Sequence, residues 1–160
     1  MKLFAALRSV VYAVIFIFLW GWLALGVRAA FGELLHLPDY RVTGIICMSL
    51  GCLIAGWCVG QFSIAGNGTP APFDAPRKLV ISGPFRYVRN PMYYGGGLLL
   101  CGFSLLKQSA TIAVFTIGFL VLAHLFVVFY EEPTLKARFG EEYRQYCGRV
   151  HRWWPTYHSQ

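Results

Sequence analysis

The stretch SATIAVFTIGFLVLAHLFVVFY, which spans Ser109–Tyr130, contains no Asp, Glu, Lys or Arg. A helix that crosses a lipid bilayer needs about 20 consecutive, predominantly apolar residues, and this stretch is long enough. Three further apolar stretches lie at Ser9–Ala30, Val42–Ala65 and Met92–Leu106. The sequence therefore predicts an all-α integral membrane protein with about four transmembrane helices.

The composition of the whole chain agrees with a membrane protein. Its 160 residues are 57% hydrophobic and only 13% charged, whereas a soluble globular domain carries about 25% charged residues. A surface with so few charges suits lipid better than water. None of the five cysteines forms a CxxC pair, so we expect neither a disulfide framework nor a metal site.

The basic residues are distributed unevenly between the two sides of such a protein. The formal net charge is +7, but no Lys/Arg-rich run points to nucleic acid as a partner. Four crossings place Arg28, Arg41 and Lys107 on one side and the other eleven basic residues on the opposite side. Because cytoplasmic loops carry an excess of Lys and Arg, we expect both termini and the loop at Gly66–Pro91 in the cytoplasm.

The chain divides into two parts. Residues 1–65 supply the first two helices, and residues 66–160 hold a Pro- and Gly-rich loop, the last two apolar stretches and a polar tail. Only Lys107 and Gln108 separate those two apolar stretches, which predicts a tight helical hairpin. Within the tail, Pro133–Cys147 has apolar residues at helical spacing and predicts a cytoplasmic amphipathic helix.

The segment Leu79–Tyr93 combines turn residues, aromatic residues and two arginines directly before the third apolar stretch. Pro91 suits the first position of a helix, and Asn90 is of a type that caps helix N-termini. The N–H groups and the dipole of a helix start favour a carboxylate or phosphate, which Arg86 and Arg89 could bind together. The alternative is that both arginines are ordinary cytoplasmic neighbours of a membrane helix.

Three ionisable residues lie near the end of the fourth stretch. Glu131 and Glu132 would oppose the macrodipole of a helix that ends there, and could bind a cation or hydroxyl groups; alternatively, they begin the next helix, where acidic residues are favourable. His124 lies seven residues before Glu131, about two turns away on the same helical face. An ionisable residue inside a membrane helix is a functional candidate, unless it only hydrogen-bonds a neighbouring helix.

Two segments resemble the signatures of one membrane enzyme family. The sequence GPFRYVRNPMYYG at Gly83–Gly95 resembles the GPYRYxRHPxYxG signature of the isoprenylcysteine carboxyl methyltransferase and phospholipid methyltransferase superfamily. The tail at Glu131–Pro155, with EEP, FGEEY and the later Tyr, Val, Arg and Pro, resembles its second signature. Gly66–Pro70 fits bacterial members, so the resemblance covers Gly66–Pro155.

The resemblance implies a membrane-embedded methyltransferase that uses S-adenosylmethionine, in the inner membrane of a bacterium. Its acceptor would be lipophilic and enter from the bilayer; the sequence leaves open whether the acceptor group is a carboxylate, an amine or a thiol, and leaves the oligomeric state open too. The residues expected to bind the cofactor are Lys78, Leu79, Val80, Phe85, Asn90, Pro91, Met92, Tyr93 and Glu131.

Three residues are expected to be catalytic. Arg89 would assist in binding the carboxylate of the cofactor, and His124 or Glu132 would take the proton from an amine acceptor. Two positions depart from the isoprenylcysteine enzymes: Asn90 stands where many members have His, and Val127 stands where those enzymes carry an Arg. These departures weaken the case for a prenylcysteine carboxylate as the acceptor.

Two other function classes fit part of the pattern. Membrane sterol reductases share a similar C-terminal architecture and bind a nicotinamide cofactor, so an NADPH-dependent membrane reductase is the alternative activity. Those reductases are much longer and have extra helices. A non-catalytic membrane scaffold is the alternative without an activity, and binding of S-adenosylmethionine, of NADPH or of neither separates the three classes.

Overall fold

The computed structural model describes residues 2–62 and 78–156. Its helices are α1 (Lys2–Phe31), α2 (Arg41–Gln61), the 3-10 helix η3 (Gly83–Arg86), α3 (Pro91–Leu106), α4 (Ala110–Phe126), the π-helical turn η4 (Val127–Glu131) and α5 (Glu132–Arg149). No β-strand occurs across these two ranges, which confirms the all-α prediction. Residues 66–77 of the predicted loop, including Gly66–Pro70 of the resemblance, lie outside the described residues.

Three helical segments are long and apolar enough to cross a membrane. They are Leu7–Phe31, Arg41–Gln61 and the continuous helical segment that begins at Ala110. The predicted membrane character is thereby confirmed. Helix α3 is also apolar, but its 16 residues fall short of the length of a typical span, so the fourth crossing stays a prediction.

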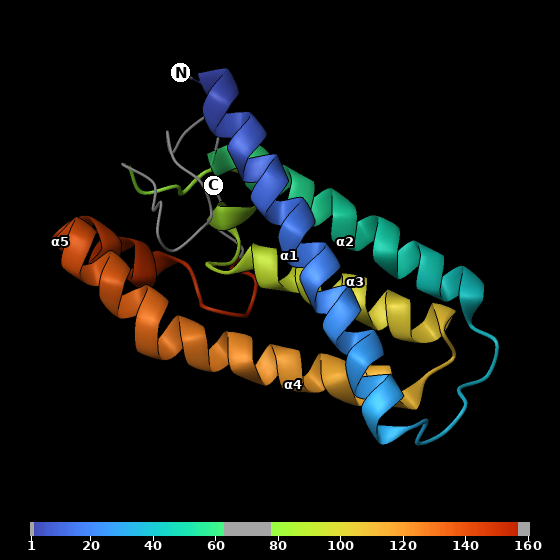
Figure 1. Ribbon diagram of the computed structural model, residues 1–160. Coiled ribbons are helices and arrows are strands. Elements are labelled where there is room, and N and C mark those ends of the chain that lie inside the picture. Colours follow the sequence, from blue (N-terminus) through green and yellow to red (C-terminus); the bar gives the residue numbers. More distant parts are fainter. Residues whose placement is uncertain (1, 63–77, 157–160) are drawn as a thin grey trace.

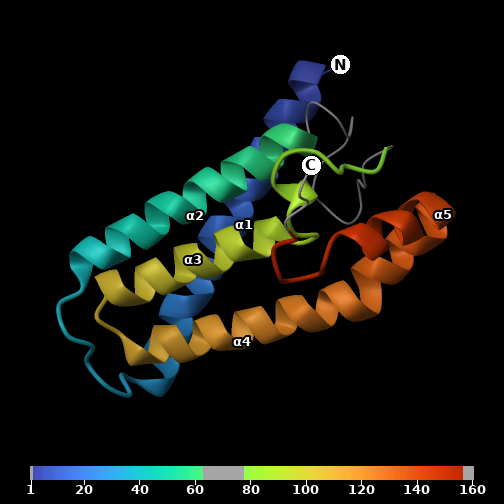
Figure 2. The same ribbon diagram turned by 180° about the vertical axis from the view of Figure 1, so that it is seen from behind.

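The helices run between two ends of the molecule (Figure 1). One end, here called the site end, holds the start of α1, the end of α2, the start of α3 and the end of α4, together with α5. The opposite end holds the α1–α2 loop and the α3–α4 turn. Helix α3 lies between α2 and α4, and α1 crosses one face of this layer, in front in Figure 1 and behind in Figure 2.

Glycines bring α2 and α3 into backbone contact. A Cβ atom added to Gly51 would lie 2.8 Å from the carbonyl oxygen of Gly95, and one added to Gly102 would lie 2.5 Å from that of Gly44. Real side chains do not approach so closely, so each position requires glycine. Small residues allow the same close approach in other membrane helix pairs, and this contact fixes the start of α3 against α2.

The end opposite the site end is tied together by Glu33, which follows α1. Its carboxylate accepts hydrogen bonds from the backbone N–H and the hydroxyl of Thr111, both at 3.1 Å, in the first turn of α4. Arg28 forms a 2.9 Å salt bridge with it. Hydrogen bonding to Ser109 and Thr111, with the charge of Arg28, lowers the pKa of Glu33 to about 2. A carboxylate at a helix N-terminus also suits the helix dipole.

The junction between α4 and α5 follows one of the two alternatives that the sequence left open for the acidic pair. The helix does not end at the acidic pair: the N–H of Glu132 bonds to the carbonyl of Val127, five residues earlier, so a π-helical turn connects α4 to α5. Glu132 is thus the first residue of α5, as in the alternative in which the acidic residues begin a helix. A helix does form over the predicted range Pro133–Cys147, as part of α5, but Gly140 has φ 52° and ψ −118° and kinks it.

Candidate active site at the site end

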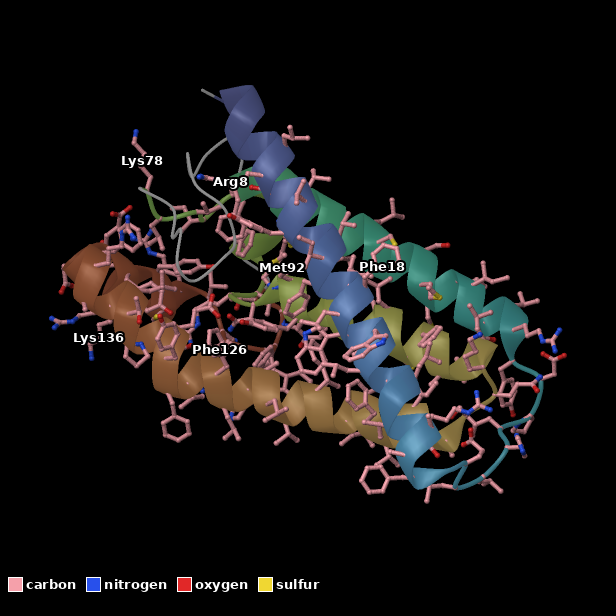
Figure 3. All side chains as sticks on the ribbon, viewed as in Figure 1. Arg8, Phe18, Lys78, Met92, Phe126 and Lys136 are labelled. Carbon is pink, nitrogen blue, oxygen red and sulfur yellow. The ribbon has the colours of Figure 1, made fainter. Side chains whose placement is uncertain are left out.

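The segment before α3 is fixed by its apolar side chains. Val80 and Phe85 are buried against Cys58 of α2. Met92, in the first turn of α3 and labelled in Figure 3, is partly buried and packs on the same cluster. Burial of these side chains holds the predicted signature segment in place at the end of α2.

Asn90 occupies the N-cap position of α3, and Pro91 is the first residue of the helix, as the sequence predicts. The Asn90 side chain makes no capping hydrogen bond, so its predicted capping role is wrong. Its amide nitrogen instead donates to the carbonyl oxygen of Arg152, at 3.2 Å. Asn90 is buried, and the C-terminal segment is the partner that satisfies it.

Tyr93 and Glu131 join the two predicted signatures. The Tyr93 hydroxyl donates to one carboxylate oxygen of Glu131 at 2.9 Å. Tyr93 projects from the first turn of α3, whereas Glu131 is the last residue of the π-helical turn. The extra residue in each turn of a π-helix changes the face on which the following side chains point, and such turns are frequent at functional sites.

Glu132 is paired with two arginines that are far apart in the sequence. Arg152 binds it through two parallel hydrogen bonds, each 2.7 Å long, and Arg89 lies 3.1 Å from it. The side chains of Arg89 and Glu132 are 11% and 17% exposed. The hydrogen bonds to Glu132 raise the pKa of Arg152. A bidentate Arg–carboxylate pair fixes geometry as well as charge, so this cluster positions the start of α5 against the start of α3.

The tail after α5 returns to the start of α3. Residues 150–156, here called the C-terminal strap, hydrogen-bond to the signature segment through the backbone. The N–H of Arg89 donates to the carbonyl of His151 at 3.0 Å, and the N–H of Thr156 donates to the carbonyl of Tyr87 at 2.8 Å. The Tyr94 hydroxyl also donates to the carbonyl of Trp153.

His124 is exposed on α4, where it meets the C-terminal strap. The indole N–H of Trp153 donates to its Nδ1 atom at 2.9 Å. The Trp153 ring also lies 6.2 Å from each of the Tyr93 and Tyr94 rings, in edge-on arrangements. His124 therefore joins the site through Trp153, a residue that the sequence analysis did not single out.

Not every predicted site residue lies in this cluster. Lys78 is exposed and points away from the body of the molecule (Figure 3). Leu79 and Arg86 line a separate groove of about 270 Å³ between the signature segment and α5. Arg86 and Arg89 therefore have different surroundings, and the structure does not bring them together on one anion. Arg89, Asn90, Tyr93, His124, Glu131 and Glu132 do come together, through direct contacts or through the strap.

The strap residues Arg152 and Trp153 are the site residues that sequence reasoning missed. Arg152 belongs to the second signature of the resemblance, and that membership could have identified it as a site residue. Trp153 stands in a Trp-Trp pair beside it, and neither periodicity nor spacing singled it out. Because the strap has no regular secondary structure, only the folded chain places these side chains.

Comparison with known proteins identifies the family of this chain. A model of the phospholipid methyltransferase family matches residues 40–142, well over half of the chain. The matched region contains α2, α3, α4 and the acidic pair, and it includes the complete Gly83–Gly95 signature. No curated protein and no solved structure matched the chain. The chain is a membrane protein that belongs to the phospholipid methyltransferase family, a family of methyltransferases.

Proposed function

We propose that this protein transfers a methyl group from S-adenosylmethionine to a lipophilic acceptor that enters from the bilayer. The observation that carries the proposal is the Tyr93–Glu131 hydrogen bond beside the Arg89–Glu132–Arg152 cluster. It joins both signature segments at one end of the helices. Because both signatures of the family meet at this end, we expect the cofactor to bind there.

The residues present fit the polar groups of this cofactor. The buried Nε atom of Arg89 has no hydrogen-bond partner within the described residues, and a buried donor without a partner is costly. Helix α3 begins without a side-chain cap, so its first N–H groups are available to an anion. Both features suit the carboxylate of a bound amino acid moiety.

The residues of the site would each bind a different part of the cofactor. Glu131 would accept hydrogen bonds from the hydroxyl or amino groups of the cofactor, with its orientation fixed by Tyr93. Arg89 and the backbone N–H groups of Met92 and Tyr93 would hold the carboxylate. Val80, Phe85 and Met92 give this end an apolar wall. When bound, S-adenosylmethionine would supply a methyl group carried on a sulfonium sulfur. After the transfer, that sulfur remains with the cofactor product as a neutral thioether.

The chain's contribution to such a reaction is mainly alignment of the two reactants. Positioning alone can lower a barrier by about 7–11 kcal/mol. The acceptor would be a carboxylate, amine or thiol on a lipid-soluble molecule, bound at the cytoplasmic side of a bacterial inner membrane. Exposed apolar residues cover the outward faces of α1, α2 and α4, as expected for helices that contact lipid.

The test is methyl transfer by detergent-purified protein from methyl-labelled S-adenosylmethionine to a panel of lipids, followed by organic extraction. The panel holds phosphatidylethanolamine, a lipophilic carboxylic acid and an alkyl thiol. Label in the extract of one panel member supports the proposal. Absence of label from every member, with folded protein that also fails to bind S-adenosylmethionine, contradicts it.

Tyr93→Phe tests the assigned geometry. The variant removes one hydrogen bond to a carboxylate, which is worth about 1.5–3 kcal/mol, so we expect affinity for S-adenosylmethionine to fall about tenfold or more. Tyr87→Phe is the matched control, because the Tyr87 side chain is half exposed and its backbone carbonyl, not its ring, holds the strap. Equal affinities in both variants would contradict the assignment of Glu131.

A further inference from the structure

The hydrogen bond between Trp153 and His124 determines which ring nitrogen of His124 carries a proton. An indole N–H is only a donor, so Nδ1 of His124 must accept the 2.9 Å bond. A nitrogen that accepts carries no proton, and a doubly protonated imidazole has no acceptor. His124 is therefore a neutral imidazole with its proton on Nε2, and the lone pair of Nδ1 is already in use.

Three neighbours fix the Trp153 ring in this orientation. The backbone carbonyl oxygen of Trp153 accepts a hydrogen bond from the Tyr94 hydroxyl. Its ring packs edge-on against Tyr93 and Tyr94 and lies 5.9 Å from the His124 ring, at an angle of 38°. The next residue toward α5, Arg152, is held on Glu132 by two 2.7 Å hydrogen bonds. The indole thus reaches His124 from a backbone that is secured on both sides.

Both predicted proton acceptors, Glu132 and His124, are already engaged in hydrogen bonds within the protein. Both oxygens of Glu132 receive hydrogen bonds or ion pairs from arginine. On His124, Nδ1 is occupied and Nε2 carries the proton. What His124 offers to a ligand is a neutral N–H group, because no hydrogen bond from Nε2 is formed within the described residues and the side chain is exposed.

The neighbours of His124 on α4 indicate where a ligand would come from. Val121 and Leu125 are 53% and 43% exposed, so this part of α4 borders lipid. A neutral N–H donor in apolar surroundings binds an oxygen lone pair and gains more from it than in water. Carboxylate and phosphate oxygens on lipid-soluble molecules have this chemistry.

We propose, on the basis of the methyltransferase function proposed above, that His124 is a specificity-determining hydrogen-bond donor. Its Nε2–H group binds a carboxylate or phosphate oxygen of the lipophilic acceptor. Trp153 is the positioning residue that holds the imidazole in this tautomer. His124 is thus assigned to binding of the acceptor rather than to removal of its proton.

The test compares His124→Gln with His124→Asn in detergent-purified full-length protein. The amide nitrogen of Gln reaches about as far from the backbone as Nε2 of His, whereas that of Asn corresponds to Nδ1, and neither amide is a base at neutral pH. We expect His124→Gln to retain methyl transfer within about threefold, and His124→Asn to lose about tenfold, as for one hydrogen bond. A loss of about 100-fold or more in both variants would indicate general base catalysis and overturn the proposal.

A spectroscopic measurement tests the tautomer without any acceptor. In protein labelled with ¹⁵N in the histidine rings, NMR should show His124 protonated on Nε2, and Trp153→Phe should abolish this preference. Protonation on Nδ1 in the unmodified protein would overturn the proposal.

The two lipid sources are distinguished by assaying phosphatidylethanolamine vesicles and a lipophilic carboxylic acid separately. The acceptor whose methylation falls in His124→Asn is the one whose oxygen binds the Nε2–H group of His124. If S-adenosylmethionine binds and methyl transfer occurs without any change in either His124 variant, His124 has no role at the acceptor and this inference fails while the methyltransferase function stands. Absence of S-adenosylmethionine binding by the unmodified protein defeats both.

Discussion

At the scale of single residues, Glu132 is the point at which the two halves of the site meet. Arg89 reaches it from the segment before α3, and Arg152 reaches it from the C-terminal strap. Removing the charge of Glu132 leaves Arg89 largely buried without its partner. Such a loss costs more than the loss of an exposed pair, because water cannot replace the missing contacts.

Glu132→Gln should therefore lower the free energy of unfolding by about 2–3 kcal/mol. Glu141→Gln is the matched control, because Glu141 also lies on α5 and pairs with an arginine, Arg144, but both side chains are more than 60% exposed. The control should change stability by less than about 0.5 kcal/mol. Thermal unfolding in detergent measures both, and equal changes would contradict the buried character of the Glu132 cluster.

Glu33 predicts a pH dependence at the opposite end. Its pKa in the folded protein is about 2, below the ordinary value of 4.5, so folding favours the charged carboxylate. Its contribution to stability is fully present above about pH 4.5 and is lost as the pH falls toward 2. The difference in unfolding temperature between the unmodified protein and Glu33→Gln should be constant near neutral pH and narrow below pH 4.5. A difference that widens on acidification would contradict this.

At the scale of helices, the contact between α2 and α3 determines where the site residues of α3 lie. Gly51 of α2 and Gly95 of α3 are in backbone contact near the start of α3. Gly44 and Gly102 form the corresponding contact near the end of α3. The start of α3 carries Tyr93, whose hydroxyl contacts Glu131. A wider separation of α2 and α3 would therefore move one signature away from the other.

Gly51→Ala should destabilise the protein by about 1–3 kcal/mol, because the added methyl group would lie 2.8 Å from a backbone oxygen. Gly56→Ala is the control on the same helix, since nothing lies within 4 Å of an added Cβ there, and alanine favours a helix over glycine by up to about 1 kcal/mol. Unfolding in detergent at increasing denaturant compares the two. Similar stabilities would contradict the close contact between α2 and α3.

The helices were predictable from the sequence because apolar stretches of this length have few other structures available. The starts of α3 and α4 follow from Pro91 and Ser109, and Ser109 accepts a capping hydrogen bond from Ile112. The π-helical turn at Val127–Glu131 was not predictable, because these residues are equally suited to an α-helix. The kink at Gly140 also escaped the apolar periodicity, which continues on both sides of it.

At the scale of the whole molecule, the chain concentrates its polar contacts at two ends and leaves apolar surface between them. The site end joins segments that are about 60 to 70 residues apart, such as Asn90 with Arg152 and Tyr87 with Thr156. Sequence reasoning located Asn90, Tyr93 and Glu131 because a signature marks them. It could not predict the contact between Trp153 and His124, since that contact depends on the path of the strap after α5.

The proposed function depends above all on binding of S-adenosylmethionine at this end of the molecule, through Glu131. The most direct measurement is calorimetric titration of the detergent-purified protein with S-adenosylmethionine, with Glu131→Ala beside it and NADPH as the competing ligand. We expect binding that Glu131→Ala abolishes, and no binding of NADPH. Binding of S-adenosylmethionine that Glu131→Ala leaves intact would contradict the site, and binding of NADPH alone would contradict the proposed activity.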